Sequence, residues 1–156
     1  MITTPGKASR CAASIPLVGM EVFLFSSTLL PMQTAQQFPM PSGVRNDWKI
    51  GIVYAPYYKE ETESLVKGAT DYLLSAGLSQ TNIILSVAPG SFEIPLLGRA
   101  LAKSGTVDAM IGFGIIVQGD THHARLLAEE VTRAMMDIQL EFLMPFAYEV
   151  LYVNSL

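Results

Sequence analysis

From residue 49 onward, apolar positions follow two patterns that alternate along the chain. Short and nearly continuous apolar runs span residues 49–54, 81–88, 109–117 and 147–154. A short run of this kind between turn residues is typical of a strand covered on both faces, as in a parallel sheet. We therefore predict four strands at these positions.

Between the strands, apolar residues recur at helical spacing. One helix is predicted from Lys59 to Gly77, with acidic residues in its first turn and glycine as its stop. A second is predicted over residues 91–103, where Pro95 is tolerable only in the first turn, and a third over residues 122–141. The expected buried positions are Leu65, Ala69, Tyr72, Leu73 and Ala76 in the first helix, Leu97, Ala100 and Leu101 in the second, and Leu127, Val131, Ala134 and Ile138 in the third.

This alternation of strands and helices predicts the fold class. It indicates βαβ units, and hence an α/β fold of three layers with a mostly parallel four-stranded sheet flanked by helices. In such sheets ligands bind beyond the carboxyl ends of the strands. Three predicted loops reach that edge: residues 55–58, 89–93 and 118–123.

The first 47 residues differ in character from the rest. Basic residues precede an apolar stretch that Pro16 and Glu21 interrupt, and a linker-like stretch with prolines follows. Three interpretations stay open: a targeting segment, an extension without structure of its own, or an additional strand or helix. We favour the extension, so residues 1–47 are predicted to be an N-terminal extension and residues 48–156 the α/β domain.

Composition excludes several classes of function. The net charge is −4 and no Lys/Arg-rich run is present, which argues against a nucleic-acid partner. Cys11 is the single cysteine and only His122 and His123 could join it, so neither a disulfide framework nor a metal site is expected. No uncharged apolar stretch is long enough for a membrane span, and no glycine-rich nucleotide-binding motif follows a strand.

The first two loops offer groups for a flat or hydroxylated ligand. Tyr57 and Tyr58 could stack on a heterocycle, or could simply pack over the end of the sheet. Ser91 and Phe92 precede Glu93 at a helix start, where the carboxylate could accept hydrogen bonds from a polyol. The alternative for Glu93 is an acidic residue that the helix dipole favours.

The third loop offers an anion site beside a titratable ring. Gly119, Asp120 and Thr121 lie between a strand and a helix N-terminus, where backbone N–H groups and the helix dipole favour negative charge. Asp120 and Thr121 are also candidates for the helix N-cap. His122 or His123 could transfer protons near neutral pH, but adjacent residues cannot both point along one helix face. We therefore expect at most one histidine in the site.

Four segments carry a resemblance to a known family: KIGIVYAPYY, APGSFEIPLLGRALA, VDAMIGFGIIVQGDTHHARLLAEEVTRAMMDIQLEF and MPFAYEVLYVN. PGSFEIP and GDTHH are specific in combination, in this order and at this spacing. Residues 49–154 resemble lumazine synthase (6,7-dimethyl-8-ribityllumazine synthase), the penultimate enzyme of riboflavin biosynthesis, which has a flavodoxin-like fold.

The resemblance implies an activity. The family condenses 5-amino-6-(D-ribitylamino)uracil with 3,4-dihydroxy-2-butanone 4-phosphate, without metal or organic cofactor. The implied route passes through an imine between the amine and the ketone, loss of phosphate, and ring closure. Imidazole suits the repeated proton transfers of this chemistry at neutral pH.

The resemblance also assigns site residues, one position at a time. His123 matches the proton-transfer histidine, because the family leaves one variable residue, here His122, between its threonine and its histidine. The other matches are Tyr57 for stacking on the uracil ring, Ser91, Phe92 and Glu93 for the ribityl chain, Gly119, Asp120 and Thr121 for the phosphate, and Tyr148 for an aromatic residue that completes the pocket of a neighbouring subunit.

The sequence departs from the family pattern in places. Gln118 stands where many members carry a basic residue, Tyr58 replaces a frequent asparagine, and Pro56 differs from the common loop. Glu149 and Tyr152 occupy positions that are usually small and hydroxylated. The family's C-terminal helices, with an arginine and a lysine that hold the substrate phosphate, have no counterpart before Leu156, so weakened activity is expected.

The family resemblance further implies small-molecule substrates and self-association, as a pentamer or a shell of pentamers, with riboflavin synthase as a further partner. Neither nucleic acid nor a membrane is expected as a partner. The expected location is the cytoplasm, or an organelle if residues 1–47 are a cleaved targeting segment. Two alternatives stay open: an oligomeric scaffold without activity, and a protein that binds a lumazine or a flavin.

Overall fold

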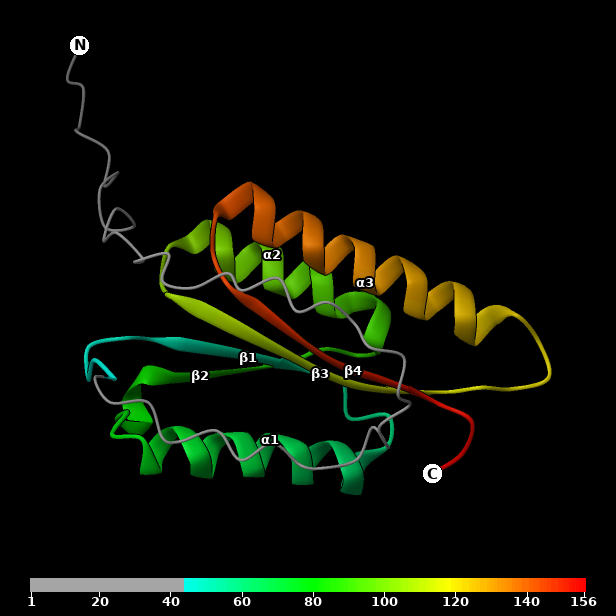
Figure 1. The fold of residues 1–156 in the computed structure, drawn as a ribbon, viewed down its shortest axis with the longest axis horizontal. Coiled ribbons are helices and arrows are strands. Elements are labelled where there is room, and N and C mark those ends of the chain that lie inside the picture. The colour runs from blue at the N-terminus through cyan, green and yellow to red at the C-terminus, as the bar shows by residue number, and fades with distance from the viewer. Residues whose placement is uncertain (1–43) are drawn as a thin grey trace, which may run out of the picture. The chain divides into compact units, whose positions relative to one another are not determined.

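A parallel four-stranded sheet forms the centre of the computed structural model, which describes residues 44–156 (Figure 1). The strand order is β2-β1-β3-β4, and every neighbouring pair is parallel. All four predicted strands are confirmed. Their bounds are Ile50–Tyr54 for β1, Ile83–Val87 for β2, Ala109–Val117 for β3 and Phe146–Val153 for β4.

Helices cover both faces of the sheet. Helix α1 (Lys59–Ser75) lies on one face, and α2 (Ile94–Ser104) and α3 (His123–Phe142) lie together on the other (Figure 1). Two short 3-10 turns, η1 (Gln80–Asn82) and η2 (Ser91–Glu93), flank β2. This arrangement confirms the predicted three-layer α/β fold.

Glycine and proline act at the helix ends as expected. Gly77 follows the C-cap of α1 with φ 99°, and Gly105 caps α2 with φ 64°, both in the region that side chains rarely adopt. Pro95 lies in the first turn of α2, where its missing N–H leaves no helical hydrogen bond unmade. Local chemistry therefore determines where α1 ends and where α2 begins and ends.

The core has one cluster on each face of the sheet. On the side of α2 and α3, Ile94, Met135 and Phe146 are almost completely buried. On the side of α1, Ile52 and Phe113 pack with the buried residues of that helix. Because β3 lies between β1 and β4 and is covered on both faces, it has the longest buried run in the sheet.

The buried stripes differ in part from those predicted. In α3 the buried residues include Ala124, Ala128 and Met135, whereas Leu127 and Ala134 are only partly buried. In α1 and α2, Tyr72 and Ala100 are exposed. Val131 and Ile138 are buried as predicted, and Leu97 and Leu101 pack against the core. The other positions differ because several apolar residues lie side by side, and only packing against the sheet selects which of them faces inward.

Most strand and helix bounds differ from the predicted ones by one or two residues, whereas α2 begins three residues later than predicted because η2 occupies residues 91–93. Strand β2 is shorter than the predicted run 81–88, because η1 takes up its start and the Ser79 hydroxyl accepts a hydrogen bond from Thr81 N at 3.4 Å. Most of the predicted N-terminal extension lies outside the described residues. Within residues 44–156, no helix combines the length and apolar character needed to cross a membrane.

Candidate active site

The three loops predicted at the carboxyl edge of the sheet lie next to one another. Ala55 N, after β1, donates to the carbonyl of Phe113 in β3 at 3.0 Å. Ala88 N, after β2, donates to the carbonyl of Tyr54 in β1 at 2.7 Å. The ends of β1, β2 and β3 are thus joined by backbone hydrogen bonds, which holds the first two loops over the same edge.

An open cavity of about 670 Å³ lies where these loops meet. Its walls come from the loops after β1 and β2, from the end of β3 and from the first turns of α3. Five residues predicted for the site line it: Tyr57, Ser91, Phe92, Glu93 and His123. A cavity of this size suits a small-molecule ligand.

His123 is the first residue of α3 and stands exposed on the cavity wall. Its neighbour His122 occupies the N-cap position and is not among the lining residues. Only one of the two imidazoles therefore faces the cavity, as the geometry of a helix start requires.

The Ser91 side chain packs closely against β3 at Gly114, where the strand has no side chain. Ser91 is 8% exposed, and a Cβ atom built on Gly114 in β3 would lie 2.8 Å from its hydroxyl oxygen. The missing side chain at Gly114 thus leaves space for η2 against β3. In η2, Phe92 is exposed to solvent, and Glu93 occupies the N-cap position of α2. The carboxylate of Glu93 is partly buried at the cavity wall, where it can accept hydrogen bonds.

Two aromatic rings, those of Tyr57 and Tyr58, also line the cavity. The ring centroids of Tyr57 and Tyr58 are 5.1 Å apart, and the ring planes meet at 74°, an edge-to-face pair. Tyr57 is 77% exposed, so its ring face is free to meet a flat ligand. Tyr58 sits at the N-cap of α1 and holds that ring from the side.

Gly119, Asp120 and Thr121 are exposed in the loop between β3 and α3, and none of the three is among the residues that line the cavity. The residues that flank this part of the chain, Val117 and His123, do line it. The first turn of α3 contains no acidic residue, so its own side chains leave the positive end of the helix dipole uncompensated. The prediction of Asp120 or Thr121 as N-cap was wrong, because His122 takes that position. The Thr121 hydroxyl instead accepts a hydrogen bond from His123 N at 3.4 Å.

Tyr148 does not reach this cavity. It lies near the start of β4, in register with Gly112, and is 37% exposed. The predicted role places Tyr148 in the pocket of a neighbouring subunit. Its absence from the cavity of its own chain is compatible with that role.

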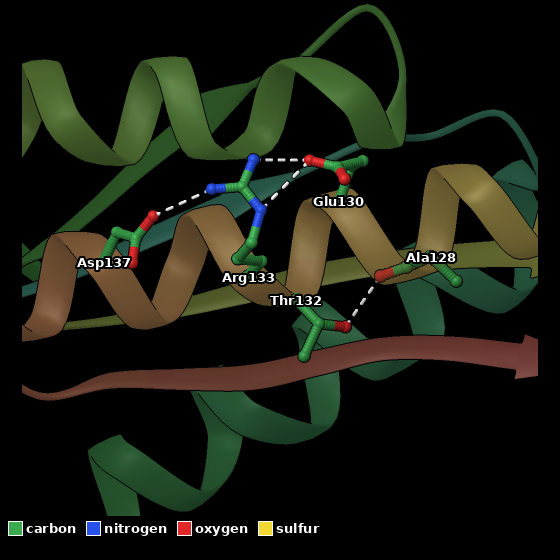
Figure 2. Close-up of polar contacts among 5 residues, drawn as sticks. All are labelled: Ala128, Glu130, Thr132, Arg133 and Asp137. Atoms are coloured by element: carbon green, nitrogen blue, oxygen red, sulfur yellow. Dashed lines mark hydrogen bonds and ion pairs between the residues drawn. The ribbon is translucent and has the colours of Figure 1, made fainter.

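Sequence reasoning missed Glu130, which also lines the cavity. Arg133 donates from Nε to Glu130 at 3.2 Å and from Nη1 to Asp137 at 3.2 Å (Figure 2). The hydrogen bond to Glu130 and its negative charge raise the pKa of Arg133. The sequence spacing could have predicted this position, because His123 and Glu130 are two helical turns apart and therefore lie on the same face of α3.

Among residues 44–156 no three His, Cys, Asp or Glu side chains are grouped so that they could hold a metal ion. The cavity instead combines aromatic faces, carboxylates, one imidazole and a helix N-terminus. A parallel α/β sheet with this set of groups over its carboxyl edge defines a small-molecule enzyme of the α/β class.

Comparison with known proteins narrows this class to a family. Residues 47–156 match the model of the family described as 6,7-dimethyl-8-ribityllumazine synthase. A relative of that name from Porphyromonas gingivalis is 36% identical over 110 residues, which cover 70% of this chain and 68% of the relative. The chain belongs to the 6,7-dimethyl-8-ribityllumazine synthase family.

Proposed function

We propose that the chain forms 6,7-dimethyl-8-ribityllumazine in riboflavin biosynthesis, from 5-amino-6-(D-ribitylamino)uracil and 3,4-dihydroxy-2-butanone 4-phosphate. The observation that carries this proposal is the convergence of Tyr57, Glu93 and His123 on one cavity beside the N-terminus of α3. A ring, a polyol and a phosphate need an aromatic face, a hydrogen-bond acceptor and an anion site, and these groups supply all three.

The residues act in two binding regions. Tyr57 stacks on the uracil ring, while Ser91, Phe92 and Glu93 bind the ribityl chain, with the carboxylate of Glu93 accepting hydrogen bonds from its hydroxyl groups. The backbone of loop 119–121 receives the phosphate of the second substrate. The substrate amine then lies within the same cavity as the ketone, which favours imine formation by proximity.

His123 transfers protons between the two substrates. Imine formation moves protons from the amine and to the departing oxygen, and the later loss of phosphate and ring closure require further transfers. The exposed imidazole on the cavity wall can both accept and donate a proton near neutral pH. The phosphate leaves as an anion beside the helix N-terminus, where the dipole stabilises its charge.

The test compares the two adjacent histidines. His123→Ala is expected to lower kcat by about 10²-fold, because it removes the proton-transfer group. His122→Ala is the matched control and is expected to change kcat by less than about twofold, since His122 does not line the cavity. Product formation is measured by its fluorescence; an equal loss in both variants, or no loss in His123→Ala, contradicts the assignment.

We further propose that the chain works as a homo-oligomer, a pentamer or a shell of pentamers, in which Tyr148 completes the cavity of a neighbouring copy. Two features support this: the aromatic side chain of Tyr148 is exposed away from its own cavity, and large apolar side chains stay exposed on α2 and α3. Riboflavin synthase as a partner, the cytoplasm as the location and the division of the chain at residue 47 remain predictions.

A further inference from the structure

The side chain of Gln118 joins the end of β3 to the loop that follows it. Its amide nitrogen Nε2 donates to the carbonyl of Gly119 at 2.6 Å and to the carbonyl of Thr121 at 3.2 Å. Both carbonyls belong to loop 119–121, the phosphate loop of the proposed function. One side chain thus draws two peptide groups of that loop to the same side.

Strand β4 orients this amide. The hydroxyl of Tyr152 donates to Oε1 of Gln118, and the backbone N–H of Gln118 donates to the carbonyl of Val153 at 2.8 Å. The reverse orientation of the amide would place Oε1 against two carbonyl oxygens, which repel it. Tyr152 therefore stabilises the orientation in which Nε2 faces the loop.

Because the peptide group is planar, the orientation of the two loop carbonyls also determines the direction of the N–H groups that follow them. In a trans peptide the C=O and the following N–H point in opposite directions. When the carbonyls of Gly119 and Thr121 turn toward Gln118, the N–H groups of Asp120 and His122 turn away from it. Within the described part of the chain neither N–H donates to another group, so both can receive an anion.

We propose that Gln118 and Tyr152 are positioning residues for the phosphate. Tyr152 orients the amide of Gln118, and Gln118 presents the N–H groups of Asp120 and His122 to the phosphate of the ketone substrate. This inference rests on the proposed function, because it takes loop 119–121 as the phosphate site.

The first experiment removes only the hydroxyl of Tyr152. Tyr152→Phe is expected to raise the KM for 3,4-dihydroxy-2-butanone 4-phosphate about fivefold, the effect of one neutral hydrogen bond. The KM for the amine substrate and kcat are expected to change less than about twofold. Tyr72→Phe is the matched control, since Tyr72 lies exposed on α1 across the sheet from α3 and should leave every constant unchanged.

A second variant separates positioning from simple anchoring of β4. Gln118→Glu keeps an acceptor for Tyr152 but places a carboxylate oxygen against the loop carbonyls, so the KM for the phosphate substrate should rise more than tenfold. If either variant raises the KM of both substrates equally and also lowers the melting temperature, the residues are structural and the proposal is overturned.

A third measurement does not depend on turnover. Inorganic phosphate is titrated into the full chain while the backbone amide NMR signals of Asp120 and His122 are followed. We expect both signals to shift in the unmodified protein, and the Kd for phosphate to be about fivefold higher in Tyr152→Phe. Signals that do not respond, or equal Kd values, overturn the proposal; responsive signals without product formation overturn only the proposed function.

Discussion

At the scale of single residues, Thr62 is unusual. It lies in the first turn of α1, its side chain is fully buried, and its hydroxyl has no hydrogen-bond partner among residues 44–156. Thr70, further along the same helix, donates its hydroxyl to the carbonyl of Val66 at 2.8 Å. The two threonines therefore differ in whether the polar atom is satisfied.

This difference predicts opposite effects of the same substitution. Thr62→Val removes an unpartnered buried hydroxyl, so the free energy of unfolding should rise by about 1 kcal/mol. Thr70→Val removes a satisfied one and should lower it by about 0.5 kcal/mol. Urea unfolding at one protein concentration measures both; a larger loss in Thr62→Val than in Thr70→Val would mean that ordered water satisfies the Thr62 hydroxyl.

The positions of the residues that line the cavity depend on neighbouring residues that do not all line it themselves. Ser91 reaches its place because Gly114 has no side chain, and Tyr57 is held by the edge of Tyr58. His123 rather than His122 faces the cavity because α3 begins at that residue. Each of these contacts would be lost if the backbone of the loop or strand moved by a few ångströms.

At the scale of elements, the contact between α2 and β4 depends on a glycine. A Cβ atom built on Gly98 would lie 2.6 Å from Cζ of Phe146, a ring that is 1% exposed and cannot move aside. On the exposed face of α1, a Cβ atom built on Gly68 would meet no other atom within 4 Å. Both glycines lie inside helices, so alanine improves the helix propensity equally at the two sites.

Comparing Gly68→Ala with Gly98→Ala separates the effect of core packing on the free energy of unfolding from the effect of helix propensity. Gly68→Ala should raise the free energy of unfolding by about 0.5–1 kcal/mol, through propensity alone. Gly98→Ala should lower it by about 1–2 kcal/mol, because overpacking against Phe146 outweighs the same gain. Urea midpoints at one protein concentration give both values, and a stabilising Gly98→Ala would show that α2 can move away from the sheet without cost.

At the scale of the whole molecule, the surface over α2 and α3 is rich in apolar side chains. The large exposed ones there are Leu96 on α2 and Leu126, Met136 and Leu140 on α3. Scattered apolar residues are normal on a monomer, but several on neighbouring elements indicate a contact surface. This supports the proposed self-association through that layer.

A charge on this surface should disrupt the assembly. Leu140 is 66% exposed on α3, so Leu140→Glu is expected to leave the fold intact and to shift sedimentation toward the mass of a single chain. Tyr72→Glu, on the exposed side of α1, is the control and should not change the sedimentation profile. A protein that sediments as a single chain before substitution, at high concentration, contradicts the proposed oligomer.

Local patterns in the sequence predict the strands and helices, and also the edge of the sheet where the candidate site lies. Continuous apolar runs predicted all four strands, and run 109–117 has the bounds of β3 without change. Gly77 and Pro95 predicted helix ends, because the steric limits of these residues act within a few positions of the chain. Parallel strands place their following loops at one edge, so the meeting of the three loops could also be predicted.

The side chains that meet across that edge could not be predicted in the same way, because their contacts depend on long-range packing. The contact between Tyr152 and Gln118 joins residues on different strands, and the cavity position of Glu130 depends on how α3 lies against η2. The unpartnered hydroxyl of Thr62 likewise reflects the packing around α1. Such relations depend on strand order and on helix rotation by a fraction of a turn, which packing over long sequence distances selects and local patterns do not specify.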